Sequence, residues 1–241
     1  MQADQKWKPE TVAALGAGLL FSVSIGMLLA LAVRKLVPGL PDSKAQFYAS
    51  VLSNFSFQGM AILFTFPFLQ SNGRSWTRFL GLDAGRFRPI VARAVLVTVL
   101  ALPMALLLRA GCEALLTALL APTEMQPALQ IIQLSASPGQ LAYTGFMAIV
   151  IAPAAEEIVF RGILYQAIKE RGWPRTGLFG TSLLFGAIHG HLPSFIALSF
   201  LGLVFAKLYD RTGSLFAPIF GHSLFNAVNF SLFLATQNTA S

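Results

Sequence analysis

Polar side chains that could take part in catalysis lie within three apolar segments near the C-terminus. They are Glu156, Glu157, Arg161, His189, His222 and Asn226. Ionisable groups are costly at membrane depth, so each of them marks a functional site or a specific packing contact. A carboxylate or an imidazole held in such a place can transfer protons as a general acid or base.

The two neighbouring carboxylates are predicted to do different jobs. Glu157 and Arg161 are four residues apart, so they share a helix face and can form a buried ion pair that fixes the helix against its neighbours. Glu156 is turned by about 100 degrees from Glu157 around the same helix. We therefore expect Glu156 to remain free to act as a general base.

The other polar groups are predicted to reach the same depth as Glu156. A rise of about 1.5 Å per residue, counted from the nearest basic turn, places Glu156, His189, His222 and Asn226 roughly 16 to 22 Å into the membrane. Either histidine alone could be a hydrogen-bonded core residue. Three helices that deliver such groups to one layer point to a shared site. His191, two residues beyond His189, is predicted to lie in a solvated loop.

The composition indicates which elements must position these residues. Of 241 residues, 55% are hydrophobic and 11% are charged, a balance typical of a protein in lipid. The length allows about seven to eight membrane helices, so we predict an all-α, polytopic transmembrane bundle forming a single membrane domain. The net charge of +7 favours anionic lipid headgroups over nucleic acid as a partner, because the basic residues flank apolar runs.

Seven apolar runs are predicted to span the membrane. They are Thr11–Val33, Gln46–Leu69, Ala94–Leu120, Gln140–Ile168, Thr176–Leu192, Pro193–Tyr209 and Ser214–Leu234. Residues 1–139 would supply N-terminal helices and a basic loop, and residues 140–236 the catalytic core. An interfacial helix is possible over Pro127–Ser137. In the first half, Arg109 and Glu113 are four residues apart and suggest a structural pair.

The distribution of basic residues predicts the orientation. The arginine-rich loop Gln70–Arg93 reads as cytoplasmic, and the loop Pro122–Gly139, which lacks Lys and Arg, reads as external. The N-terminus would then be cytoplasmic, in a multi-pass protein of a bacterial inner membrane. The exceptions to this rule are Arg34, Lys35 and Lys44.

Between about Gln140 and Leu234 the sequence resembles the CPBP family of intramembrane proteases, also described as the C-a-a-X processing and bacteriocin-immunity (Abi) family. The family has three motifs, Glu-Glu-x-x-x-Arg, Phe-x-x-x-His and His-x-x-x-Asn, and all three are present in order. They correspond to Glu156, Glu157 and Arg161, then Phe185 and His189, then His222 and Asn226.

The resemblance implies hydrolysis of a peptide bond in a membrane-tethered protein or peptide. Glu156 and His189 would bind and deprotonate a water molecule, and His222 and Asn226 would donate hydrogen bonds to the oxyanion. Glu157, Arg161 and Phe185 would support these groups. The substrate is not readable from the sequence: a prenylated C-a-a-X end, a leader peptide, a bacteriocin-related peptide and a C-terminal sorting anchor all fit the family.

Three alternatives remain open. Glu156, His189 and His222 match the two-histidine, one-glutamate set of catalytic zinc sites, although we favour a reaction without a cofactor because neither histidine lies in a His-Glu-x-x-His motif. Glu and His residues at mid-membrane could also form the relay of a proton-coupled transporter or channel. A non-catalytic immunity or scaffold protein could share the fold.

Overall fold

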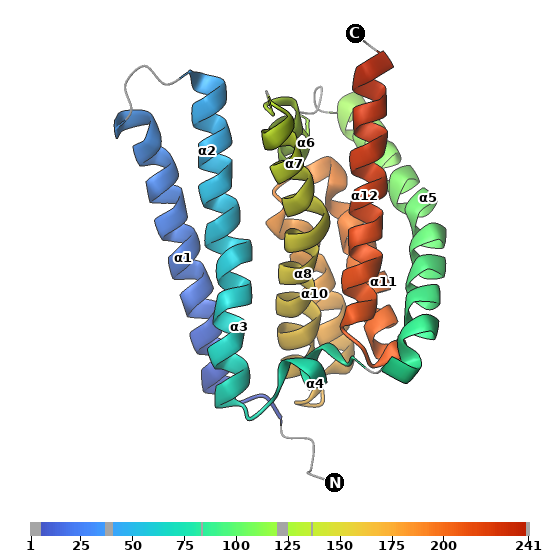
Figure 1. The fold of residues 1–241 in the computed structure, drawn as a ribbon. Coiled ribbons are helices and arrows are strands. Elements are labelled where there is room, and N and C mark those ends of the chain that lie inside the picture. The colour runs from blue at the N-terminus through green and yellow to red at the C-terminus, as the bar shows by residue number, and fades with distance from the viewer. Residues whose placement is uncertain (1–5, 37–40, 83, 120–124, 136, 240–241) are drawn as a thin grey trace.

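Helices make up the regular structure of this chain. The computed structural model describes residues 6–36, 41–82, 84–119, 125–135 and 137–239, and these ranges contain no strand. Figure 1 shows the helices running side by side in one bundle, with the N-terminus at one end and the C-terminus at the other. The predicted all-α fold is confirmed.

The elements are numbered in chain order. The α-helices are α1 (Pro9–Leu36), α2 (Asp42–Asn54), α3 (Met60–Ser71), α4 (Trp76–Leu80), α5 (Phe87–Leu119), α6 (Pro127–Gln133), α7 (Pro138–Phe146), α8 (Ala152–Glu157), α9 (Gln166–Lys169), α10 (Pro174–Ile188), α11 (Leu192–Thr212) and α12 (Phe216–Thr239). Three π-helical segments, η1 (Phe55–Gly59), η3 (Met147–Ile151) and η4 (Ile158–Tyr165), and the 3-10 turn η2 (Ala84–Arg86) join some of them.

The chain is an integral membrane protein. In the described ranges, five helical stretches are long and apolar enough to cross a membrane: Pro9–Ala32, Asp42–Ser71, Phe87–Leu119, Leu192–Thr212 and Phe216–Gln237. Each corresponds to one of the seven predicted runs. The two other runs, Gln140–Ile168 and Thr176–Leu192, are also helical, but they are not among these five.

The central part of the first of these two segments is enclosed by other helices, whereas the second has an exposed apolar face that includes Phe179, Leu183 and Ile188. The first is the continuous helical run from α7 to α9, in which nearly every residue from Ala152 to Ile163 is buried. The second, α10, has only 15 residues. A helix enclosed by other helices does not need the apolar surface that lipid contact demands, so polar motif residues can replace part of that surface in α8 and η4.

The basic segment Gln70–Arg93 is only partly a loop. It contains α4, whose first turn is capped by Ser75 Oγ accepting from the Arg78 backbone N–H at 3.4 Å, and which ends at Gly81 with a φ of 64°. It also contains the first turns of α5, which begins at Phe87. The local cap and the left-handed glycine explain why a short helix forms there. A helix, α6, is present within the segment Pro127–Ser137, and its interfacial position stays a prediction.

The N-terminal segment ties the first half of the bundle to the second. The Trp7 backbone N–H donates to Glu170 Oε2 at 2.8 Å, and Arg74 Cζ lies 3.8 Å from the centroid of the buried Trp7 ring. Lys8 N–H donates to Asn72 Oδ1 at 3.1 Å. These contacts hold α1 and α3 at the turn that follows α9.

Close packing of α10 against α11 gives a first prediction. A Cβ atom on Gly202 would lie 2.9 Å from the Ser182 Cα atom, a backbone contact that cannot relax cheaply. Gly202→Ala should therefore lower the free energy of unfolding by about 1 to 3 kcal/mol, measured by thermal unfolding in detergent. Gly180→Ala is the control, because no atom lies within 4 Å of its Cβ position. Equal stability of the two variants would contradict this account of the interface.

Candidate active site

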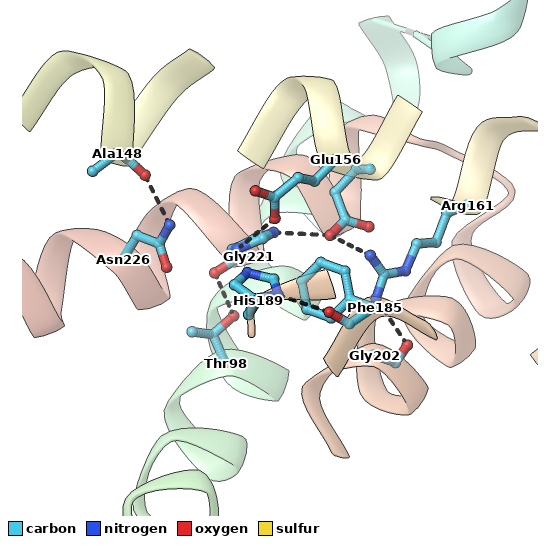
Figure 2. A network of polar contacts seen from close by, with 11 residues as sticks. Thr98, Ala148, Glu156, Arg161, Phe185, His189, Gly202, Gly221 and Asn226 are labelled. Carbon is cyan, nitrogen blue, oxygen red and sulfur yellow. Dashed lines mark hydrogen bonds and ion pairs between the residues drawn. The ribbon is translucent and has the colours of Figure 1, made fainter. Parts of the chain in front are cut away.

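Four of the predicted side chains line one cavity of about 500 Å³. Glu156 comes from α8, His189 directly follows α10, and His222 and Asn226 come from α12. Figure 2 shows the labelled Glu156, His189 and Asn226 on separate helices, with Asn226 to one side and bonded to Ala148. The four residues thus line the same cavity, and their common depth in the membrane stays a prediction.

Glu157 and Arg161 lie behind the cavity wall. Arg161 Nη1 donates to Glu157 Oε1 at 2.9 Å, and their side chains are 1% and 0% exposed. Arg161 Nη2 also donates to the Gly202 carbonyl at 3.1 Å, so the pair connects η4 to α11. The expected ion pair is present. Its contact with α11 satisfies part of the buried guanidinium, as a desolvated charge requires.

A contact that the sequence did not predict joins this pair to the cavity. His222 Nδ1 lies 2.9 Å from Glu157 Oε1, the oxygen that also accepts from Arg161. A carboxylate only accepts, so Nδ1 carries the hydrogen and Nε2 is the nitrogen available for other contacts. Glu156 Oε2 lies 3.9 Å from this Nε2. One imidazole thus links the two neighbouring carboxylates.

His189 has a fixed tautomer for a similar reason. Its Nδ1 lies 2.7 Å from the Phe185 carbonyl oxygen, which only accepts, so Nδ1 donates. Phe185 belongs to the last turn of α10, where carbonyl groups have no partner within the helix. In the neutral ring, Nε2 of His189 is then unprotonated and can accept a proton from water.

Aromatic rings hold the polar groups in place. The Phe185 ring packs against Arg161, with Cζ 4.5 Å from the ring centroid, and its centroid lies 4.9 Å from that of His189 and 5.8 Å from that of His222. On its other side, His222 stacks on Phe205 at 5.2 Å with an interplanar angle of 21°. Phe185, expected as a supporting residue, contacts all three motifs.

Asn226 is oriented by a backbone carbonyl. Its Nδ2 donates to the Ala148 oxygen at 2.8 Å (Figure 2). In η3 the Ala152 N–H donates to the Met147 carbonyl, a π-helical step of five residues. The donor for Ala148 in that register would be residue 153, and Pro153 has no N–H. The proline therefore leaves free the carbonyl that Asn226 uses.

Polar residues from the first half also line the cavity, among them Asn54, Gln58 and Arg109. Within the described ranges, Gln58 Oε1 is buried without a hydrogen-bond partner. Arg109 was predicted only as a structural residue. The sequence signal was available, since each of these groups interrupts an apolar run, but no short motif connects them to the C-terminal half.

The prediction for His191 is wrong. Its side chain is 9% exposed, and its Nδ1 lies 2.8 Å from Ser194 Oγ. The reason is local: α11 begins at Leu192, directly after His191, so the imidazole folds back on the first turn of that helix. It does not belong to the group that lines the cavity.

A catalytic zinc ion would need three protein ligands close together. Among the residues that the structure describes, no three His, Cys, Asp or Glu side chains are grouped closely enough to hold one. The combination of Glu156, His189 and His222 therefore lacks a metal-ligand arrangement in this conformation.

Part of the chain is similar to known proteins. Residues 138–228 match a family described as type II CAAX prenyl endopeptidase Rce1-like. "Putative membrane peptidase YdiL" of Bacillus subtilis (strain 168) is 36% identical over 78 residues, which cover 32% of each chain. "Uncharacterized protein YpbD" of the same organism is 34% identical over 87 residues, 34% of this chain and 41% of the relative.

The matches are local. The chain spans about a third of the length of YdiL and 41% of the length of YpbD. No solved structure matches. The segment matched by the family contains all the motif residues described above.

The shared Glu157 oxygen gives a second prediction. Arg161→Met should lower the free energy of unfolding by about 3 to 5 kcal/mol, because it leaves a buried carboxylate without its cation. The double variant Glu157→Gln/Arg161→Met should recover much of this loss, since Gln is neutral and its carbonyl can still accept from His222. Thermal unfolding of both variants in detergent measures the difference. A double variant as unstable as the single one would show that charge burial is not the cause.

Proposed function

We propose that this chain is a CPBP-type intramembrane endopeptidase that uses an activated water molecule, and the match of residues 138–228 to the Rce1-like family supports this proposal. The observation that carries the proposal is the convergence of Glu156, His189, His222 and Asn226 on one cavity. The substrate would be a membrane-tethered protein or peptide. The protein would act in a bacterial inner membrane with a cytoplasmic N-terminus, among anionic headgroups.

The first step is activation of water. Glu156 and His189 both border the cavity, and Nε2 of His189 can accept a hydrogen bond while Nδ1 donates to Phe185. A water molecule held between these groups transfers a proton to Glu156 as its oxygen attacks the carbonyl carbon of the scissile bond. The carbonyl oxygen then becomes the oxyanion of a tetrahedral intermediate.

The second step is stabilisation and collapse of this intermediate. Asn226 has a second N–H besides the one that donates to Ala148, and Nε2 of His222 donates when the ring carries both protons. When the oxyanion reforms the carbonyl, the C–N bond breaks, and Glu156 returns its proton to the departing amine.

The environment favours this use of hydrogen bonds. His222 and Glu156 are 5% and 8% exposed, so donors at the cavity act in a medium of low dielectric constant. One donor to an oxyanion commonly contributes about 3 to 4 kcal/mol to transition-state stabilisation.

Glu156→Gln should abolish proton transfer while preserving the shape of the site. We expect kcat to fall by at least about 10²-fold, which is typical for loss of a general base. The assay uses protein in liposomes with three tethered probes: an S-prenylated C-a-a-X peptide, a hydrophobic leader peptide and a C-terminal sorting-anchor peptide. Mass spectrometry of new termini measures cleavage.

Glu113→Gln is the matched control, because it makes the same change on an exposed residue of α5. Retained cleavage by the Glu156→Gln protein would reject the assignment. The same assay with a chelator tests the choice of a metal-free reaction. Loss of activity that zinc restores would overturn that choice.

The paired asparagines of α12 provide a further prediction. Asn226→Ala should lower kcat by about 10² to 10³-fold, because it removes an oxyanion donor. Asn229 lies one turn further along the cavity, and its Nδ2 donates to the Phe225 carbonyl of its own helix at 2.8 Å. Asn229→Ala should therefore change KM rather than kcat. Similar kcat losses in both variants would argue against the oxyanion role of Asn226.

A further inference from the structure

The cavity extends from the catalytic groups toward one end of the bundle. On α12 its lining runs from His222 to Thr236, a distance of about 21 Å at 1.5 Å per residue. Gln126 and Leu129, at the start of α6, also line it. Figure 1 places α6 and the end of α12 together, at the end of the bundle opposite the N-terminus. The catalytic residues therefore form the floor of a tall cavity.

Toward the other end of the bundle, the space next to the catalytic groups is filled with side chains. A separate pocket of about 350 Å³ lies there between α1 and α3, where Leu15, Phe64 and Phe68 line it, and it shares no lining residue with the cavity. None of the residues 157–184 and 202–221 lines the cavity, although all of them are described. The buried Glu157 and Arg161 pair lies directly behind the floor. Beyond it, a Cβ atom on Gly162 would lie 2.6 Å from the Phe79 ring and 3.0 Å from Leu215, so little space remains.

The filled end is also the basic end. The basic residues in its turns and helix ends are Lys6, Lys8, Arg74, Arg78, Arg86, Arg88, Arg93, Lys169, Arg171, Arg175, Lys207 and Arg211. Several cap the bundle there: Arg86 donates to the Thr212 carbonyl at 2.9 Å, and Lys169 pairs with Asp210 at 2.6 Å. An excess of Lys and Arg marks the cytoplasmic side of a membrane protein.

We infer that substrate reaches the catalytic groups from the non-cytoplasmic face of the membrane. This inference rests on the proposed function. It narrows the substrate class to segments exposed on the outer side of the membrane after translocation. The segment would be extended and mainly apolar, because Leu106, Phe230 and Phe233 form part of the wall. At about 3.3 Å per residue, a path of 21 Å holds about six residues of extended chain.

Cysteine accessibility tests the route without any need for activity. Cys112→Ala provides a background without a thiol, since Cys112 is the single cysteine of the sequence. Asn229→Cys and Thr236→Cys report on the cavity, and Lys207→Cys, on an exposed residue, reports on the basic end. A membrane-impermeant cationic thiosulfonate is added to spheroplasts and to inside-out vesicles.

Both cavity cysteines should react at least tenfold faster in spheroplasts than in inside-out vesicles, and Lys207→Cys should show the reverse preference. Two outcomes would overturn the inference: cavity cysteines that react from the same side as Lys207→Cys, and cavity cysteines that react from neither side while Lys207→Cys does. Size-exclusion profiles of the purified variants establish that each protein is folded.

The two proposals fail in different ways. Labelling in the Glu156→Gln background should be unchanged, because Gln occupies the same volume as Glu. Loss of the expected sidedness would therefore reject the access route and leave the catalytic assignment in place. Retained cleavage by Glu156→Gln would reject the catalytic assignment and leave the access route in place.

Discussion

One carboxylate oxygen, Oε1 of Glu157, accepts hydrogen bonds from both Arg161 and His222, each at 2.9 Å. A buried charge must be satisfied by such partners, so this oxygen determines where η4 and α12 lie relative to each other. It also selects the tautomer of His222 and directs Nε2 toward Glu156. Arg161 extends the network to α11 through the Gly202 carbonyl. The site depends on this network more than on any single catalytic side chain.

Much of the site could be predicted from the sequence because its elements are local. The spacing of Glu157 and Arg161 predicts their pair, and helical rise predicts that Glu156, His189 and Asn226 reach one layer. The contact between Glu157 and His222 joins residues 65 positions apart in the sequence, and the periodic pattern of a helix cannot predict a contact at that separation. Composition predicted the all-α fold, but it does not indicate which helices lie next to one another in space.

The remaining differences have physical causes of their own. The segments α8 and η4 are buried among other helices and carry polar residues in place of lipid-facing apolar ones, whereas α10, with 15 residues, is shorter than a typical span. His191 is buried because a helix begins directly after it. Arg109 and Gln58 line the cavity from helices that carry no motif. The N-terminal half, which showed only hydrophobic runs in the sequence, therefore supplies part of the wall around the catalytic residues.

The missing N–H of Pro153 has a consequence for transferring this chemistry to another scaffold. Asn226 can donate to the Ala148 carbonyl because Pro153, five residues after Ala148, has no N–H that could donate to it. A designed protein that copied only the motif side chains onto regular α-helices would present a carbonyl already engaged by its own helix. The grafted asparagine would then rotate among several conformers. A graft of this site must therefore include Pro153 together with Asn226.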